Sequence, residues 1–214
     1  MRSADYSGFT LSEVMISIAI VGIISVAAFY SLRQGRMNDE LNTAVRVVAS
    51  DLRNVQSRAL TAQNVKFCED TSTPTAKNIV CENSTALCQT PVVCTAVPPA
   101  GVGVHLTKAG SGYDFYAKYD PGTTDWREVD PGEVFFTRSL ATAGASNVKI
   151  SKLGTADMSA LDVAFQRQNG NMLIDACPAG CTNLTTITIT LQHKVSLKTA
   201  SVSLNTITGR ISID

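Results

Sequence analysis

The sequence has no excess of either charge, few histidines, and none of the common catalytic fingerprints. Lys and Arg together number 18, as do Asp and Glu, so the formal net charge is zero. A neutral chain gives no general argument for a nucleic acid or another strongly charged partner. No GxSxG, HExxH, Walker or dinucleotide-binding pattern occurs, and His105 and His193 stand apart from any Ser or Cys motif. We therefore expect neither catalysis nor a cofactor.

Charge is absent from residues 14–32, although this apolar run begins directly after Glu13. The run is long enough to cross a bilayer as a helix. A secretory signal peptide fits poorly, because the only basic residue before the run is Arg2 and the best cleavage site, near Ala27, lies inside the run. A carboxylate buried without a partner costs several kcal/mol. A plain membrane anchor therefore leaves Glu13 unexplained.

The segment Gly8-Phe9-Thr10-Leu11-Ser12-Glu13, followed by the apolar run, resembles the N-terminus of type IV pilins and type II secretion pseudopilins. The resemblance implies a leader peptide at residues 1–8, cleavage by prepilin peptidase between Gly8 and Phe9, and methylation of the new amino group of Phe9. It also implies that Glu13 neutralises the N-terminal ammonium of a neighbouring subunit in a filament. Opposite charges attract strongly in the low dielectric of such a helix bundle.

The same resemblance implies the surroundings of the chain. The partners would be other pilins or pseudopilins, prepilin peptidase, the inner-membrane assembly platform and, before assembly, the lipid bilayer. The chain would cross the inner membrane of a Gram-negative cell once, with its C-terminal domain in the periplasm. It would then enter a pilus or a pseudopilus.

One long helix is predicted over residues 9–63, with a transmembrane part at 14–32 and an amphipathic part at 36–62. Apolar side chains in the second part recur at intervals of one, three or four. They are Leu41, Ala44, Val45, Val48, Leu52, Val55 and Ala59. Polar residues fall mainly on the other face: Arg46, Ser50, Arg53, Asn54, Ser57 and Arg58. We expect the apolar stripe to pack on a β-domain.

Residues 64–214 predict a β-rich globular domain with a Cys-rich loop at 64–100, in which at most one or two short strands are expected, at 65–67 and 78–80. Turn signals separate nine further strands. We expect these at 103–108, 113–119, 133–140, 148–151, 160–166, 172–176, 185–194, 198–205 and 210–213. The fold class is therefore α+β and pilin-like: one long N-terminal α-helix packed on an antiparallel β-sheet domain of one or two sheets, with a disulfide-tied loop region.

Six cysteines occur, at Cys68, Cys81, Cys88, Cys94, Cys177 and Cys181. Behind an N-terminal export segment, an even set indicates disulfides formed in an oxidising compartment. Zinc is the alternative, but the spacings contain no paired CxxC and both histidines are remote in sequence. We expect Cys177 to pair with Cys181 across a tight loop, and the other four to pair among themselves.

The C-terminal part resembles GspH/FimT-type minor pilins and pseudopilins. The resembling segments are Val163-Ala164-Phe165 with Gly170, Ser203-Leu204-Asn205, and Gly209-Arg210-Ile211. The resemblance implies a structural minor pilin that helps initiate or cap a type IV pilus. The alternatives are a GspH-like minor pseudopilin of a type II secretion system and, in another class, a pilus-tip binding module that acts as an adhesin or a DNA uptake receptor.

The binding alternatives depend on a few side chains. Some FimT-like pilins bind DNA through a basic Gly-Arg-x-Arg element, but here Ser212 stands where the second arginine would be. Lys194, Lys198 and Arg210 could still form a small patch, with weak and salt-sensitive binding expected from so few charges.

Acidic and aromatic residues offer two further alternatives. A calcium site could use Asp120, Asp125, Glu128, Asp130 and Glu133, but aspartate is favoured in Asp-Pro-Gly turns for its backbone bonds, so no metal is predicted. Aromatic residues including Trp126 could form a binding face. Strand alternation, however, places Tyr113, Phe115, Ala117 and Tyr119 on one face of a strand and Asp114 with Tyr116 on the other.

Overall fold

The computed structural model describes residues 10–70, 77–81, 94–119, 133–154, 158–168, 171–175 and 185–214. Residues 1–39 and 40–214 form two compact units. The helix α1, Leu11–Thr61, contributes its first part to one unit and its second part to the other. The expectation of one long N-terminal helix is therefore confirmed, and the helix has 51 residues.

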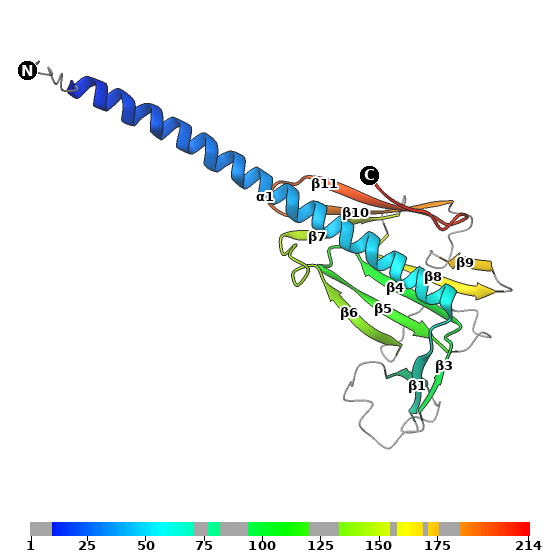
Figure 1. The fold of residues 1–214 in the computed structure, drawn as a ribbon. Coiled ribbons are helices and arrows are strands. Elements are labelled where there is room, and N and C mark those ends of the chain that lie inside the picture. Colours follow the sequence, from blue (N-terminus) through cyan, green and yellow to red (C-terminus); the bar gives the residue numbers. More distant parts are fainter. Residues whose placement is uncertain are drawn as a thin grey trace, which may run out of the picture. The chain divides into compact units, whose positions relative to one another are not determined.

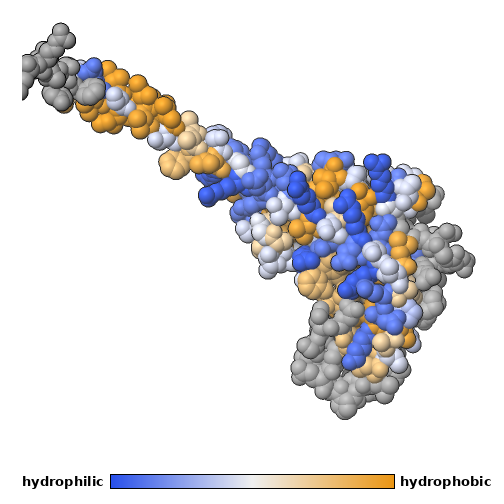
Figure 2. Space-filling model, in the orientation of Figure 1, coloured by the Kyte–Doolittle hydropathy of each residue, from blue (hydrophilic) through white to orange (hydrophobic). Residues whose placement is uncertain are grey.

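The N-terminal part of α1 presents apolar side chains to its surroundings. Its large hydrophobic residues from Leu11 to Leu32 are each at least 45% exposed. Figure 2 shows this end of the helix as almost continuous hydrophobic surface. By length and composition α1 can cross a membrane, and it is the one helix among the described residues that can. So much exposed apolar surface indicates lipid or other helices as the partner.

All twelve described strands pair antiparallel and form three sheets (Figure 1). The three-stranded sheet has the order β2-β1-β3, with β1 at Val65–Asp70, β2 at Lys77–Val80 and β3 at Cys94–Val97. The five-stranded sheet has the order β6-β5-β4-β8-β9, with bounds Val134–Ser139, Gly112–Lys118, Gly101–Thr107, Ala160–Gln168 and Asn171–Asp175. The four-stranded sheet has the order β12-β11-β10-β7, with bounds Ile211–Ile213, Thr199–Asn205, Thr186–His193 and Val148–Leu153.

Backbone hydrogen bonds connect the two larger sheets. Ala109 N–H donates to the Ile150 carbonyl at 2.8 Å, and Ile150 N–H donates to the Gly110 carbonyl at 3.0 Å. The turn between β4 and β5 is thereby fastened to β7. As Figure 1 shows, the second part of α1 runs across both sheets. One face of the helix therefore covers the core side of both sheets.

The core confirms the predicted apolar stripe of α1. All seven of its residues are at most 6% exposed, and they join one cluster with the inward side chains of both larger sheets. Alternation in β10 buries Ile187, Ile189 and Leu191 on the same cluster. Every buried apolar side chain of the described residues lies between Leu41 and Ile211, so a fragment of residues 33–214 retains the whole core.

One strand-level expectation needs correction, and one aromatic side chain is buried for a reason that the sequence pattern does not show. Besides the two short strands expected in the Cys-rich loop, the structure has a third, β3, because it pairs with β1 opposite a disulfide-bonded cysteine. Tyr116 lies on the face opposite Phe115 but is fully buried, because its ring covers Gly103 on the neighbouring strand β4. Only a residue without a Cβ leaves room for that ring. Tyr119, by contrast, is 42% exposed and stacks edge-on against Phe67.

Candidate functional site

Glu13 and Thr10 form a reciprocal capping box at the start of α1. Thr10 N–H donates to Glu13 Oε2 at 2.9 Å, and Glu13 N–H donates to Thr10 Oγ1 at 3.3 Å. The Thr10 hydroxyl also donates to Glu13 Oε2 at 2.9 Å. This arrangement gives the Thr10 N–H an acceptor, and it adds to the bond that the Glu13 N–H makes with the Thr10 carbonyl at 3.1 Å. The motif Thr-x-x-Glu in the sequence signals such a box, and our sequence reasoning missed it.

The capping box gives Glu13 a role in its own helix, and this role does not neutralise the negative charge of its carboxylate. Both residues are exposed in the isolated chain, so the carboxylate stays accessible at the first turn of an apolar helix. Gly8 and Phe9, the predicted processing residues, lie outside the described part of the chain. The geometry is therefore compatible with a carboxylate that caps its own helix and also attracts a cation from a neighbour.

The three cysteines among the described residues all form disulfides. Cys68 in β1 is bonded to Cys94 in β3, directly opposite in the strand register. Cys81 is also disulfide-bonded. Cys88, Cys177 and Cys181 lie outside the described residues, so the pairing expected for Cys177 and Cys181 stays a prediction. Where the structure is described, no group of three or more His, Cys, Asp or Glu side chains could hold a metal.

The three basic residues considered for DNA binding do not converge. Lys194 and Lys198 flank the turn between β10 and β11, whereas Arg210 follows the turn at the far end of β11. The seven residues of β11 separate the two turns by about 20 Å at the usual rise of a strand. Lys194 and Lys198 therefore share a site without Arg210.

The acidic cluster is mostly outside the described residues, which exclude Asp120, Asp125, Glu128 and Asp130 as well as Trp126. Its last member, Glu133, forms an ion pair with Lys118 at 2.8 Å. The Lys118 side chain is only 7% exposed. Glu133 thus has a structural partner of its own.

A buried ionic cluster joins α1 to the five-stranded sheet. Asp51 accepts two hydrogen bonds from Arg138, from Nε at 2.9 Å and from Nη2 at 3.2 Å, and one from the Tyr113 hydroxyl at 2.6 Å. Burial and the neighbouring Asp51 carboxylate raise the pKa of Tyr113 well above its ordinary value. The hydrogen bonds to Asp51 also raise the pKa of Arg138. Sequence reasoning missed this cluster, although Asp51 lies three residues from Val48 and four from Val55 on the buried stripe.

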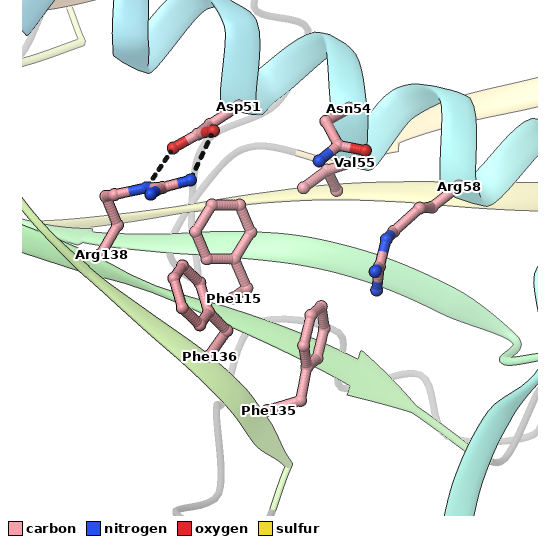
Figure 3. Close-up of a pocket in the computed structure, with 8 residues that line it drawn as sticks. All are labelled: Asp51, Asn54, Val55, Arg58, Phe115, Phe135, Phe136 and Arg138. Atoms are coloured by element: carbon pink, nitrogen blue, oxygen red, sulfur yellow. Dashed lines mark hydrogen bonds and ion pairs between the residues drawn. The ribbon is translucent and has the colours of Figure 1, made fainter. Parts of the chain in front are cut away.

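Beside this cluster lies a hollow of about 490 Å³ between α1 and the edge strand β6 (Figure 3). Its lining is Asp51, Asn54, Val55, Arg58, Phe115, Phe135, Phe136 and Arg138. Arg58 lies 5.3 Å from the centre of the Phe135 ring, and Arg138 lies 5.0 Å from that of Phe136. These are cation–π distances.

Four polar side chains cross the five-stranded sheet in register, from β6 to β8: Thr137, Asp114, His105 and Asp162. His105 Nδ1 lies 2.6 Å from Asp162 Oδ1, and Thr137 donates to Asp114 at 2.6 Å. The hydrogen bond to Asp162 raises the pKa of His105, burial opposes it, and the charges of Asp162 and Asp114 add to the rise. Folding therefore favours the protonated form of His105, which lies opposite Asp162 and Asp114 in the strand register.

This row predicts a pH-dependent stability. Because folding raises the pKa of His105, its stabilisation is complete below the pKa of an unfolded histidine, about 6.5, and is lost as the pH rises through the folded-state pKa. The free energy of unfolding of the 33–214 fragment should thus fall, relative to a His105→Gln variant, as the pH rises above about 6. Urea denaturation at each pH measures it. Asp162→Asn should weaken the difference, and identical pH profiles for wild type and His105→Gln would contradict the assignment.

Comparison with known proteins adds one match. Residues 4–29 match the family model of the prokaryotic N-terminal methylation motif. No curated protein and no solved structure matches the chain. The match supports a precursor of the type IV pilin or pseudopilin kind, which implies processing by a prepilin peptidase and assembly with other pilins. Such a motif indicates a structural rather than an enzymatic protein, and with the apolar part of α1 it fits a single-pass membrane anchor.

Proposed function

We propose that this chain is a structural minor pilin of a type IV pilus. Prepilin peptidase cuts between Gly8 and Phe9, and the amino group of Phe9 is methylated. Before assembly the chain crosses the inner membrane at residues 14–32, with its β-domain in the periplasm. It then joins other pilins through α1 and helps initiate or cap the filament.

Glu13 is the observation that carries this proposal. It is the single acidic residue at the start of a helix whose next charged residue is Arg33, and it lies inside the matched methylation motif. A neighbour's N-terminal ammonium would neutralise it as helices pack. At 4 Å, two unit charges attract by about 4 kcal/mol at an effective dielectric constant of 20. This attraction favours packed over unpacked subunits.

The capping box permits a test that separates charge from helix capping. Glu13→Gln removes the charge but keeps a side chain that completes a capping box, whereas Thr10→Ala removes the cap and keeps the charge. We expect Glu13→Gln to reduce the chain in sheared filaments at least about tenfold, because the charge pair is lost. Thr10→Ala should have a much smaller effect, since a lost cap costs about 1 kcal/mol.

The measurement is an immunoblot of filament and membrane fractions from the native host, with mass spectrometry of the N-terminus. Both variants should be processed and should begin at a methylated Phe9. Normal incorporation of Glu13→Gln would refute charge pairing. A mature chain that begins at Met1, or near Ala28, would refute the prepilin assignment itself.

A minor pseudopilin of a type II secretion system would use the same helix and the same Glu13. Deleting the gene separates the two proposals. Loss of surface pili with normal protein secretion supports the minor pilin, and accumulation of secreted proteins in the periplasm with normal pili supports the pseudopilin. At about 0.15 M salt, DNA binding that depends on a few charged contacts is screened. Retention of the 33–214 fragment on DNA at this salt concentration would therefore favour a DNA uptake receptor.

A further inference from the structure

We propose that residues 194–198, the turn between β10 and β11, form a membrane-docking surface that rests on anionic lipid headgroups while the chain is anchored in the bilayer. This inference rests on the proposed membrane anchoring through α1. It adds a second contact with the membrane, made by the β-domain, before assembly withdraws the chain.

The turn combines exposed apolar side chains with lysines. Val195 is 56% exposed and Leu197 is 66% exposed, although each lies in a folded turn of the larger unit. Lys194 and Lys198 flank them, and both are exposed. Apolar side chains that enter the headgroup region next to lysines that contact lipid phosphates are typical of peripheral membrane surfaces.

The backbone of the turn holds these side chains outward. Leu197 has a φ of 57°, a left-handed conformation that is uncommon for a bulky residue. Leu197 N–H donates to the His193 carbonyl at 2.9 Å, and His193 N–H donates to the Lys198 carbonyl at 3.0 Å. The N–H groups of Val195 and Ser196 donate to His193 Nδ1 at 3.3 and 3.1 Å. The exposed side chains of Val195 and Leu197 therefore lie on a turn whose backbone conformation is fixed by hydrogen bonds.

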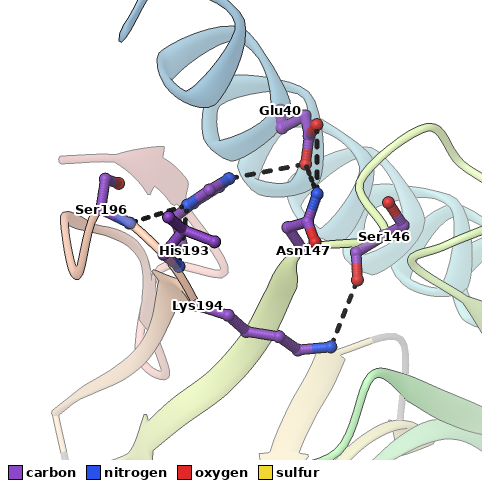
Figure 4. Close-up of polar contacts among 7 residues, drawn as sticks. Glu40, Ser146, Asn147, His193, Lys194 and Ser196 are labelled. Carbon is purple, nitrogen blue, oxygen red and sulfur yellow. Dashed lines mark hydrogen bonds and ion pairs between the residues drawn. The ribbon is translucent and has the colours of Figure 1, made fainter. Parts of the chain in front are cut away.

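Polar contacts fasten the turn to the first residue of the second unit, Glu40 (Figure 4). His193 is 1% exposed, and its Nε2 lies 3.6 Å from Glu40 Oε2. Asn147 Nδ2 donates to the same oxygen at 3.1 Å, and the Asn147 carbonyl accepts from Lys194 N–H at 2.7 Å. Lys194 Nζ also donates to the Ser146 carbonyl at 3.2 Å. The turn and Glu40 thus form one local cluster.

Chain connectivity places this cluster near the bilayer. The uncharged run ends at Leu32, and Arg33 is the first charged residue after it, so the apolar part of the anchor ends here. From Leu32 to Glu40 the chain spans about 12 Å as a helix and at most about 29 Å if fully extended. At the helical length, Glu40 lies about 12 Å beyond the end of the uncharged run, so the turn that follows its contact residue His193 can reach the headgroups.

The lipid surface suits this turn better than nucleic acid does. Two lysines neutralise too few phosphates for appreciable nucleic-acid binding, and such binding would leave Val195 and Leu197 without a role. An anionic bilayer uses both kinds of side chain. Near such a surface each lysine favours the bound state about fivefold, so the pair favours it about thirtyfold.

The chain offers a matched reference position at the opposite end of β11. Ile207 lies in the turn between β11 and β12 and is 76% exposed, so it is apolar and even more accessible than Leu197. We suggest Val195→Trp and Ile207→Trp as tryptophan reporters in the full chain, each combined with Trp126→Phe. The chains are reconstituted into vesicles of phosphatidylcholine with about one-third phosphatidylglycerol, carrying brominated acyl chains that quench nearby tryptophan.

We expect strong quenching of the reporter at position 195 and little at position 207. Lys194→Gln with Lys198→Gln, or Leu197→Ser, should reduce quenching at 195, and vesicles of phosphatidylcholine alone should do the same. Arg210→Gln is the charge control and should change nothing. Circular dichroism checks that each variant is folded.

Equal quenching at both positions, or none at 195, would overturn the inference. If quenching at position 195 is the same in the lysine variants and in vesicles of phosphatidylcholine alone, the assignment of anionic headgroups is wrong. If the turn docks on a second subunit instead, quenching is absent in dilute vesicles that hold single chains. Resistance to alkaline extraction measures membrane insertion independently of quenching. A chain that inserts but is not quenched refutes the docking of the turn alone. A chain that fails to insert refutes the proposed membrane anchor.

Discussion

Replacing Asp51 with Ala should lower the free energy of unfolding of the 33–214 fragment by about 3 kcal/mol. The change leaves the Tyr113 hydroxyl buried without its acceptor and removes both bonds to Arg138. Breaking a buried ion pair by removing one partner costs about 3–5 kcal/mol. We expect the lower end because the Arg138 side chain is 35% exposed and can be hydrated in the variant.

Urea denaturation followed by circular dichroism measures this effect. Asp39→Ala is the matched control, an exposed aspartate on the same helix, and should change stability by less than about 0.5 kcal/mol. Tyr113→Phe removes one donor and keeps the ion pair, so about 1 kcal/mol is expected. If Asp51→Ala costs no more than Asp39→Ala, the cluster does not stabilise the attachment of α1 to the sheet.

The double variant Cys68→Ala, Cys94→Ala should lose about 3.5 kcal/mol, because the disulfide closes a loop with a sequence separation of 26 residues. In the chain-entropy account, removing the bond returns that loop's freedom to the unfolded state. Cys68 is also buried, at 2% exposure, and β1 places Val65 and Phe67 in the core. Loss of the bond therefore loosens an element that the core includes.

Lys66→Ala is the control for this prediction, since Lys66 is an exposed residue of the same strand, and its effect should be within about 0.5 kcal/mol. Both are measured by urea denaturation under oxidising conditions. Peptide mapping without reduction should recover Cys68 linked to Cys94, and would also show whether Cys177 is linked to Cys181. If the double variant has the same free energy of unfolding as Lys66→Ala, the disulfide does not stabilise the domain and constrains only the three-stranded sheet.

Much of the fold followed from local patterns. The seven apolar stripe residues of α1 were predicted by helical spacing, and all are buried. The nine strands expected after the Cys-rich loop are all present, because turn signals and period-two alternation are properties of neighbouring residues. The third short strand in that loop, β3, was not predicted, since its pairing with β1 depends on a contact between distant segments.

The candidate sites divide in the same way. The methylation motif and Glu13 are readable in the sequence because their spacing is fixed along one helix. Asp51 was overlooked, since its partners Tyr113 and Arg138 come from other strands and only the packing of α1 on the sheet brings them together. Lys194, Lys198 and Arg210 looked like one patch in the sequence, but β11 carries Arg210 to the opposite end of the sheet.

By itself, the sequence determined the processing motif, the apolar part of α1 and the order of helix and strands, because each depends on residues close together in the chain. Tertiary structure alone decided which acid of α1 is buried and paired, which aromatic covers Gly103, and which exposed turn lies beside Glu40. These are contacts between segments distant in sequence. Their energies depend on geometry that no local pattern encodes.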